Sequence, residues 1–359
     1  KSNTTADNNI AVGFCSLFSS TTGTRNVAVG TRAMKFTTTG ADNVAVGYQA
    51  LDSNTEGCCN TAVGGDALGV NSTGNFNTAV GKNALLANTT GACNVSVGVF
   101  TLDANTTGAC NTGLGYGALS VNTTASNNTA VGFYSLLENT TGCRNTAMGF
   151  EAGKANTTGD ENTFIGRKAG LGVTTTDNQT AIGSFALSAA VTGANNTAVG
   201  KSALSANTSG AHSVAVGCGA LASNTTSGEN TAVGFGALAA QTTGTPNDAF
   251  GNQSLCKLTT GTHNTGLGFR AMCDVTTGVR NVSVGNSAGY KTTTGNENVA
   301  IGRASNLSNT TGNNNVSVGH CAGYNITTGG QNINIGGYTT VASATASYSL
   351  AIGYNIVGK

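Results

Sequence analysis

The sequence contains no tryptophan, one proline and few charges, since 9% of its 359 residues are charged and the net charge is +1. So balanced a chain has no field that would attract nucleic acid or an anionic membrane surface, and neither is expected as a partner. No apolar run approaches the ~18 residues of a membrane-spanning helix, so membrane insertion is not expected either.

Residues suited to catalysis are equally scarce. Only three histidines occur, and His212 and His263 lie three repeats apart in the pattern described below. No nucleophile–base pair, phosphate-binding loop or regular calcium-binding pattern of aspartates is present. We therefore expect no enzyme, no metal site and no cofactor.

Glycine, in contrast, is abundant, with 53 residues, and 38% of the chain is hydrophobic. The glycines follow no Gly-X-Y triplet, which excludes collagen. The apolar content is too high for a simple disordered chain. A repetitive, ordered fold is the remaining class.

The repeat is 17 residues long and has no insertion or deletion. Its marker glycines run from Gly13 to Gly353 in steps of 17, which makes 21 repeats. The consensus is N-[TV]-A-V-G-x-x-A-L-x-x-N-T-T-G-x-x, and we number its columns from the asparagine. Seventeen residues are too few for a helical repeat and fit one coil of a β-solenoid with two or three short strands. We predict an all-β, parallel β-solenoid of 21 coils, with a lead-in at 1–8 and one continuous solenoid over 9–359 whose last coil is incomplete.

Each column has an expected role. Column 4 is apolar in every coil, as at Val80, and is predicted to point into the coil together with column 2. Glycine in columns 5 and 15 is predicted at corners with positive φ. Asparagine holds column 1 in 18 of 21 coils, either as a hydrogen-bonded amide ladder or because it tolerates left-handed turns. Column 3 is nearly all small and is expected to form a smooth face, open to solvent or to another chain.

The stretches "NTAVG", "AL" and "NTTG", and above all "NVAVGYQAL" at 43–51, resemble the head repeats of trimeric autotransporter adhesins. They are also similar to the arrays of phage tail-fibre and spike proteins that end in an intramolecular chaperone. The resemblance covers all 21 coils. It implies a left-handed β-roll, a parallel homotrimer and a host-contacting or adhesive fibre outside the cell.

Two cysteine pairs are predicted to form disulfides: Cys93 with Cys110, and Cys256 with Cys273. Each pair shares a column in adjacent coils, where strand spacing brings the Cα atoms to about 4.8 Å. The alternative is that all ten cysteines are small, half-buried apolar residues.

Column 12 often begins an N-x-[ST] sequence, which predicts a row of glycosylation acceptors along one edge of the coils. The candidates are Asn71, Asn88, Asn105, Asn122, Asn139, Asn156, Asn207, Asn224 and Asn309. The high content of Asn and Thr also produces such matches without modification.

Column 6 varies and is therefore expected to be exposed. It contains consecutive aromatic residues, Tyr116, Phe133 and Phe150, which are candidates for contact with a sugar or another chain, although isolated exposed aromatics are common. The leading prediction is an extracellular structural or adhesive fibre: a rigid spacer or head on a cell surface, filament or virion. Its expected partners are further copies of itself, as a homotrimer or an end-to-end filament, and a host-surface glycan or protein.

Two other functions remain open. One is a self-assembling filament subunit. The other is an ice-binding solenoid that uses the threonines of columns 13 and 14, which are expected to face in opposite directions.

Overall fold

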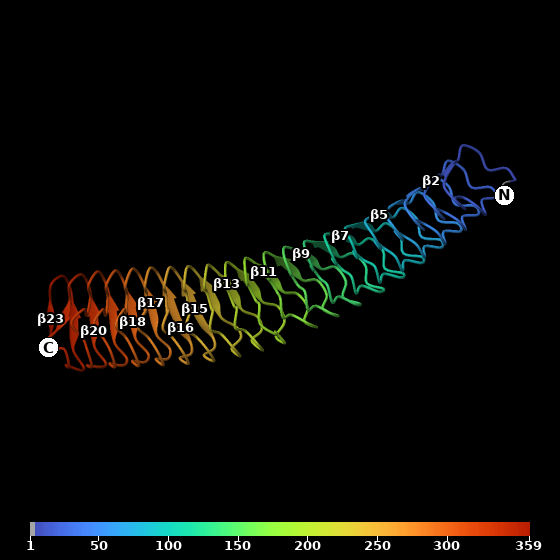
Figure 1. Cartoon of the computed structure of the whole chain (residues 1–359). Helices are drawn as coiled ribbons and strands as arrows, with labels where there is room; N and C mark the ends of the chain where they lie inside the picture. Colours follow the sequence, from blue (N-terminus) through green and yellow to red (C-terminus); the bar gives the residue numbers. More distant parts are fainter. Residues whose placement is uncertain (1–3) are drawn as a thin grey trace. The chain divides into compact units, whose positions relative to one another are not determined.

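The computed structural model describes residues 4–359 and confirms the all-β class. Across these residues there is no helix, and the chain forms a parallel β-solenoid of about 21 coils with a 17-residue period (Figure 1). The chain divides into two compact units, one ending at Gln179 and the other beginning at Thr180.

The first unit contains ten strands, and each pairs in parallel with the strand one coil away at a register of 17 residues, as for Ala28 and Ala45. The strands are β1 (Ile10–Val12), β2 (Val27–Val29), β3 (Val44–Val46), β4 (Thr61–Val63), β5 (Thr78–Val80), β6 (Val95–Val97), β7 (Thr112–Leu114), β8 (Thr129–Val131), β9 (Thr146–Met148) and β10 (Thr163–Ile165).

The second unit repeats this arrangement and adds a short second sheet. This second sheet consists of two strands of two residues each, Thr340–Val341 and Val357–Gly358, which pair in parallel. The strands of the second unit are β11 (Thr180–Ile182), β12 (Thr197–Val199), β13 (Val214–Val216), β14 (Thr231–Val233), β15 (Asn247–Phe250), β16 (Asn264–Leu267), β17 (Val282–Val284), β18 (Val299–Ile301), β19 (Val316–Val318), β20 (Ile333–Ile335), β21 (Thr340–Val341), β22 (Leu350–Ile352) and β23 (Val357–Gly358).

Most coils therefore have one strand, and the prediction of two or three per coil is wrong. The rest of each coil is a series of turns in which columns 7, 9 and 17 adopt positive φ, as at Asn83 (59°), Leu85 (52°) and Cys93 (60°). Leucine rarely adopts this conformation. Here its burial compensates for the strain, because Leu85 is fully buried in the coil.

The strand faces are the reverse of the predicted arrangement. Column 3 is buried, as Ala79 is, while columns 2 and 4 lie outside and are partly exposed. Because successive side chains of a strand alternate, a three-residue strand with its middle residue inside must turn its other two residues outward. Columns 2 and 4 do share one face, as predicted, but that face is the outer one.

The interior of each coil is correspondingly narrow. Alanine predominates in columns 3 and 8 and leucine in column 9, and several coils have Ser, Thr, Gly, Met or Asn in one of these columns instead. The largest side chain among these interior positions is the fully buried Phe164 in column 3. Column 9 is glycine on both sides of its ring: a Cβ on Gly153 would lie 2.9 Å from Cε2 of Phe164, and one on Gly170 would lie 2.8 Å from its Cγ.

The two glycine columns differ. Column 5 has φ between 118° and 140° in every coil, as predicted. Gly91 in column 15 lies outside the left-handed region, so the prediction of positive φ there is wrong. A side chain is excluded for a steric reason instead: a Cβ on Gly91 would lie 3.0 Å from Nδ2 of Asn105.

The predicted ladder in column 1 is confirmed. The side-chain oxygen of Asn77 accepts the backbone N–H of Asn94 in the next coil at 2.9 Å, and its amide donates to the carbonyl of Gly91 at 2.8 Å. Each asparagine thus closes its own coil and binds the next one.

The predicted lead-in begins in residues 1–3, which lie outside the described residues. Thr4 and Asp7 already hydrogen-bond to the first full coil. The backbone N–H of Thr4 donates to the carbonyl of Thr21 at 3.2 Å, and the backbone N–H of Arg25 donates to the carbonyl of Asp7 at 3.2 Å. Both pairings keep the solenoid register, so the coil pattern begins before residue 9.

Candidate functional site

The main candidate surface is the outer face of the sheet, which we call the sheet face and define as columns 2 and 4. In the first unit, from Ile10 to Ile165, columns 2 and 4 contain only Val, Ile, Thr, Leu and Met, so the sheet face has no charged residue there. None of its side chains is buried; for example, Leu114 is 45% exposed and Met148 43%. In the second unit the face has the same character, apart from Asp248. Column 4 thus adds an uninterrupted row of partly or fully exposed apolar side chains to a column 2 that is mainly threonine, valine or isoleucine, and large exposed apolar surfaces are typical of contact sites.

The small residues of column 3 cannot serve as the expected packing face, because Ala79 and its equivalents lie inside the coil. The surface available to another chain is formed instead by their two strand neighbours.

The predicted contact residues Tyr116, Phe133 and Phe150 lie together beside the sheet face and are exposed, as expected for column 6. Tyr116 and Phe133 stack with their ring centroids 5.4 Å apart, and Phe133 and Phe150 are 5.5 Å apart and nearly parallel. With Phe100, 5.9 Å from Tyr116, and Tyr134, 4.1 Å from Phe133, they form what we call the aromatic cluster.

Sequence reasoning did not identify Phe100 and Tyr134, which belong to column 7. The signal was present in the glycine that precedes Tyr134 by one coil. A Cβ on Gly117 would lie 2.7 Å from the ring of Tyr134, so glycine there leaves room for the ring.

The geometry of the cluster limits what it can bind. Stacking from coil to coil occupies the ring faces, so the rings offer mainly their edges to a partner. A sugar would need an open ring face, whereas apolar side chains of a protein can pack against ring edges.

A charged group borders the aromatic cluster and was also missed. The carboxylate of Glu151 forms ion pairs with two ammonium groups: its Oε1 lies 3.0 Å from Nζ of Lys154, and its Oε2 lies 3.4 Å from Nζ of Lys168. The hydrogen bond from Lys154 is the main reason that the pKa of Glu151 lies below its usual range. The ammonium of Lys154 also lies 5.6 Å from the ring centroid of Tyr134, which joins the two groups.

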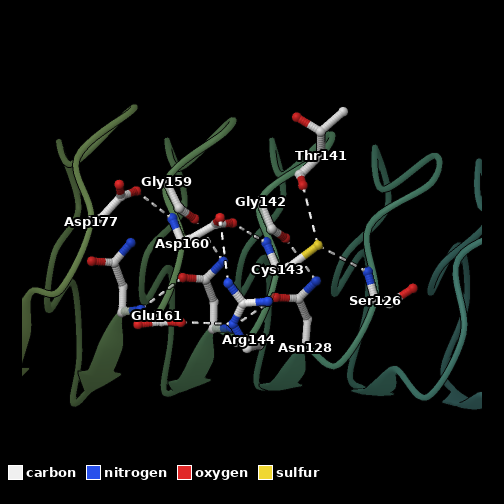
Figure 2. Close-up of polar contacts among 12 residues, drawn as sticks. Ser126, Asn128, Thr141, Gly142, Cys143, Arg144, Gly159, Asp160, Glu161 and Asp177 are labelled. Atoms are coloured by element: carbon white, nitrogen blue, oxygen red, sulfur yellow. Dashed lines mark hydrogen bonds and ion pairs between the residues drawn. The ribbon is translucent and has the colours of Figure 1, made fainter.

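Columns 16 and 17 form a polar seam on another side of the coil (Figure 2). The backbone N–H of Ser126 donates to the sulfur of Cys143 at 3.4 Å, that of Cys143 to a carboxylate oxygen of Asp160 at 2.6 Å, and that of Asp160 to Asp177 at 2.7 Å. From Cys143 to Asp177, each column 16 side chain thus accepts the column 16 N–H of the coil before it. The role of this chain of contacts is structural.

Ion pairs between adjacent coils run beside the seam. Arg144 binds Glu161 at 2.9 Å and Asp160 at 3.7 Å, as Figure 2 shows. Arg25 holds Asp42 at 2.6 Å, and this hydrogen bond lowers the pKa of the Asp42 carboxyl. Because the pairs are exposed, each contributes little to stability.

All ten cysteines are free thiols in the structure. Of the predicted pairs, Cys256 and Cys273 have their sulfurs 2.6 Å apart. Cys93 and Cys110 are exposed on column 17. The two bridges stay predictions, and only the pair of Cys256 and Cys273 has its sulfurs in contact.

The column 12 asparagines are not on an edge. All nine predicted glycosylation acceptors are fully buried. Asn88 shows why: its amide donates to the side-chain oxygen of Asn71 at 2.8 Å and to the carbonyl of Gly91 at 2.9 Å. A glycan on this nitrogen would break a second amide ladder and could not fit inside the coil, so the prediction of a sugar-bearing edge is wrong.

The two threonine columns, on which the ice-binding alternative depends, differ in exposure to solvent. Thr89 in column 13 is partly buried, and its hydroxyl donates to the carbonyl of Thr106 at 3.0 Å. Thr90 in column 14 is exposed. Only one threonine column is thus fully available to solvent, where a flat ice-binding array needs two.

Among residues 4–359, no group of three or more His, Cys, Asp or Glu side chains is placed to hold a metal ion. The same residues contain no helix whose length and apolar character would suffice to cross a bilayer.

Comparison with known proteins gives no family. No protein-family model matches the chain, and no curated protein matches its sequence. The likeness to adhesin heads and phage fibres therefore remains a prediction.

Proposed function

We propose that this β-solenoid is a structural and adhesive fibre protein that works outside the cell and associates with further copies of itself through the sheet face. The observation that carries this proposal is the outer surface of columns 2 and 4, which is apolar throughout column 4, alternates between apolar residues and threonine in column 2, and has no charge in the first unit. Interface centres are depleted of charge in the same way.

A second copy is the partner that suits this surface best. Each copy presents apolar side chains at one fixed spacing, set by the coil-to-coil register. Identical solenoids share this spacing, so their sheet faces can pack side by side over many coils without loss of register. A parallel trimer is the arrangement that the resemblance implies.

The aromatic cluster supports the same function. It extends the sheet face sideways in the coils where Leu114 and Met148 replace the usual valine. Buried aromatic residues frequently anchor protein interfaces. We assign these coils to the strongest part of the contact between copies, and a host-surface protein or glycan remains a further partner to be identified.

The test is the molar mass in solution, measured by light scattering and compared with 35.3 kDa for one chain. We expect three copies, and we expect Leu114→Lys with Met148→Lys to reduce the mass toward one copy. A matched control, Thr107→Lys on the exposed column 14, should leave the mass unchanged.

A monomer at micromolar concentration would refute self-association. A trimer unaffected by the double substitution would refute the assigned surface. Very large, polydisperse particles would instead support the end-to-end filament.

A further inference from the structure

Two thiols face each other in column 10 of consecutive coils of the second unit. Cys256 and Cys273 are 17 residues apart in sequence, and their sulfurs are 2.6 Å apart. Backbone bonds hold the two coils together on both sides of the pair: the N–H of Leu255 donates to the carbonyl of Ala271 at 2.9 Å, and that of Lys257 to the carbonyl of Cys273 at 3.2 Å. A disulfide bond of about 2.05 Å could therefore close with small side-chain rotations.

The two sulfurs differ in access to solvent. Cys273 is buried, with 6% of its surface exposed, while Cys256 is half-buried. The sulfur of Cys256 also lies 3.4 Å from the carbonyl of Cys273. A small reagent arriving from solvent therefore has better access to Cys256, and Cys273 lies next to it in the adjacent coil.

The surroundings favour a thiolate on the accessible sulfur. A hydrogen bond from the thiol of Cys273 lowers the pKa of Cys256 to about 7, and the positive charge of Lys257 acts in the same direction. The same hydrogen bond, together with burial, raises the pKa of Cys273.

The neighbouring charged and titratable groups come from the two coils that contain the pair and from the coil that follows them. Lys257 is paired with Asp274 at 2.7 Å, and the next coil places Tyr290 in column 10 and Lys291 in column 11. Asp274 partly offsets the effect of Lys257 on Cys256.

We propose that Cys256 and Cys273 form a redox-active dithiol, which small peroxides convert into a disulfide between adjacent coils. In the first step the thiolate of Cys256 attacks one oxygen of hydrogen peroxide, the O–O bond breaks, hydroxide leaves and Cys256 becomes a sulfenic acid. In the second step the sulfur of Cys273 attacks the sulfur of Cys256, the S–O bond breaks, and water leaves with the thiol proton. Two electrons pass from the two sulfurs to peroxide.

The other predicted pair serves as the internal comparison. Cys93 and Cys110 occupy column 17, where both are exposed. Because the thiol of Cys273 and the charge of Lys257 stabilise a thiolate on Cys256, this residue should react with peroxide several times faster than the comparison pair at pH 6.

The experiment uses the whole reduced chain without substitution. It is exposed briefly to limiting hydrogen peroxide at pH 6, the remaining thiols are blocked, and the protein is cleaved with trypsin and a Glu-specific protease. The fragments 230–257 and 271–280 each contain one cysteine, and 83–138 contains the comparison pair. We expect mass spectrometry to find 230–257 joined to 271–280 before 83–138 loses its two thiols.

A second arm tests the order of the steps. In Cys273→Ser the sulfenic acid on Cys256 has no partner, so it should accumulate and be trapped by dimedone. Cys218→Ser, which removes an exposed cysteine of the same unit, should leave the cross-link unchanged. The far-ultraviolet circular dichroism of each variant checks that it is folded. If Cys273→Ser is unfolded, the order of cross-linking in the unsubstituted chain tests the proposal alone.

Two results would overturn the proposal. One is oxidation of Cys256 at the same rate as Cys93 and Cys110. The other is oxidation of Cys256 in the unsubstituted chain without a bond to Cys273.

Discussion

Replacing Phe164 with alanine should destabilise the first unit strongly, and restoring leucine in the two flanking column 9 positions should reverse the loss. Phe164 is fully buried. Its ring occupies the space that two leucines fill elsewhere in the solenoid, because Gly153 and Gly170 have no side chain there.

The magnitude follows from that geometry. A buried Phe→Ala change costs about 3–5 kcal/mol. We expect the upper half of this range, since the glycines on both sides offer no side chain that could move into the cavity. Two buried leucines would contribute roughly 1.5–3 kcal/mol each. The triple variant Phe164→Ala, Gly153→Leu, Gly170→Leu should therefore return close to the original stability.

The backbone permits this exchange. Gly153 and Gly170 have φ of 58° and 60°, near the 48° of Leu136, so leucine would adopt the conformation it already has in this column. Gly170→Leu alone should lower the stability of the chain, because the new Cβ would overlap the ring of Phe164. Overpacking of this kind costs about 1–3 kcal/mol or more.

The measurement is guanidinium unfolding of the four proteins, followed by circular dichroism and compared at a common m-value. If Phe164→Ala lost less than about 1 kcal/mol, or if the leucines failed to restore stability, the complementary packing of these three residues would be refuted.

Two further predictions concern buried amides and acid stability. Asn105→Ala removes the hydrogen bonds to Asn88 at 2.8 Å and to Gly108 at 3.0 Å and leaves buried polar groups unpaired, so it should reduce the free energy of unfolding in urea by about 2–5 kcal/mol. The control Thr107→Ala, on the exposed column 14, should change stability by less than about 0.5 kcal/mol. Equal effects of the two substitutions would contradict the amide ladder. Because the pKa of Glu151 is lowered by its hydrogen bond with Lys154, the stabilisation by this pair is complete above the ordinary glutamate pKa of about 4.3 and is lost as the pH falls through the lowered value. Lys154→Met should therefore be less stable than the original chain at pH 7, with a difference that shrinks below pH ~4 in urea titrations; a difference independent of pH would exclude this ion pair as its cause.

Several features could be predicted because they depend only on repetition. A strict 17-residue spacing requires equivalent residues to stack, so the parallel register, the column 1 ladder, the column 5 glycines and the grouping of Tyr116, Phe133 and Phe150 follow from the spacing. Cys256 and Cys273 could be paired in the same way, since one column and adjacent coils bring two side chains together.

The direction of each side chain could not be predicted so simply. Val80 was expected inside because it is apolar, and Asn88 outside because it is polar. Both expectations fail. Where leucine fills column 9, the middle of the strand has room inside for alanine, whereas Phe164 fits there because the neighbouring column 9 residues are glycine. The buried asparagine satisfies its hydrogen bonds in an interior amide ladder.

The amino-acid sequence by itself thus determined the period, the β-class and which residues stack on one another. Only the tertiary structure decided which residue of each strand lies inside, where the exposed apolar face runs and which thiols touch. The physical reason is that stacking is set by the spacing along the chain, while inside and outside are set by how the side chains of columns 3, 8 and 9 fill the space within each coil.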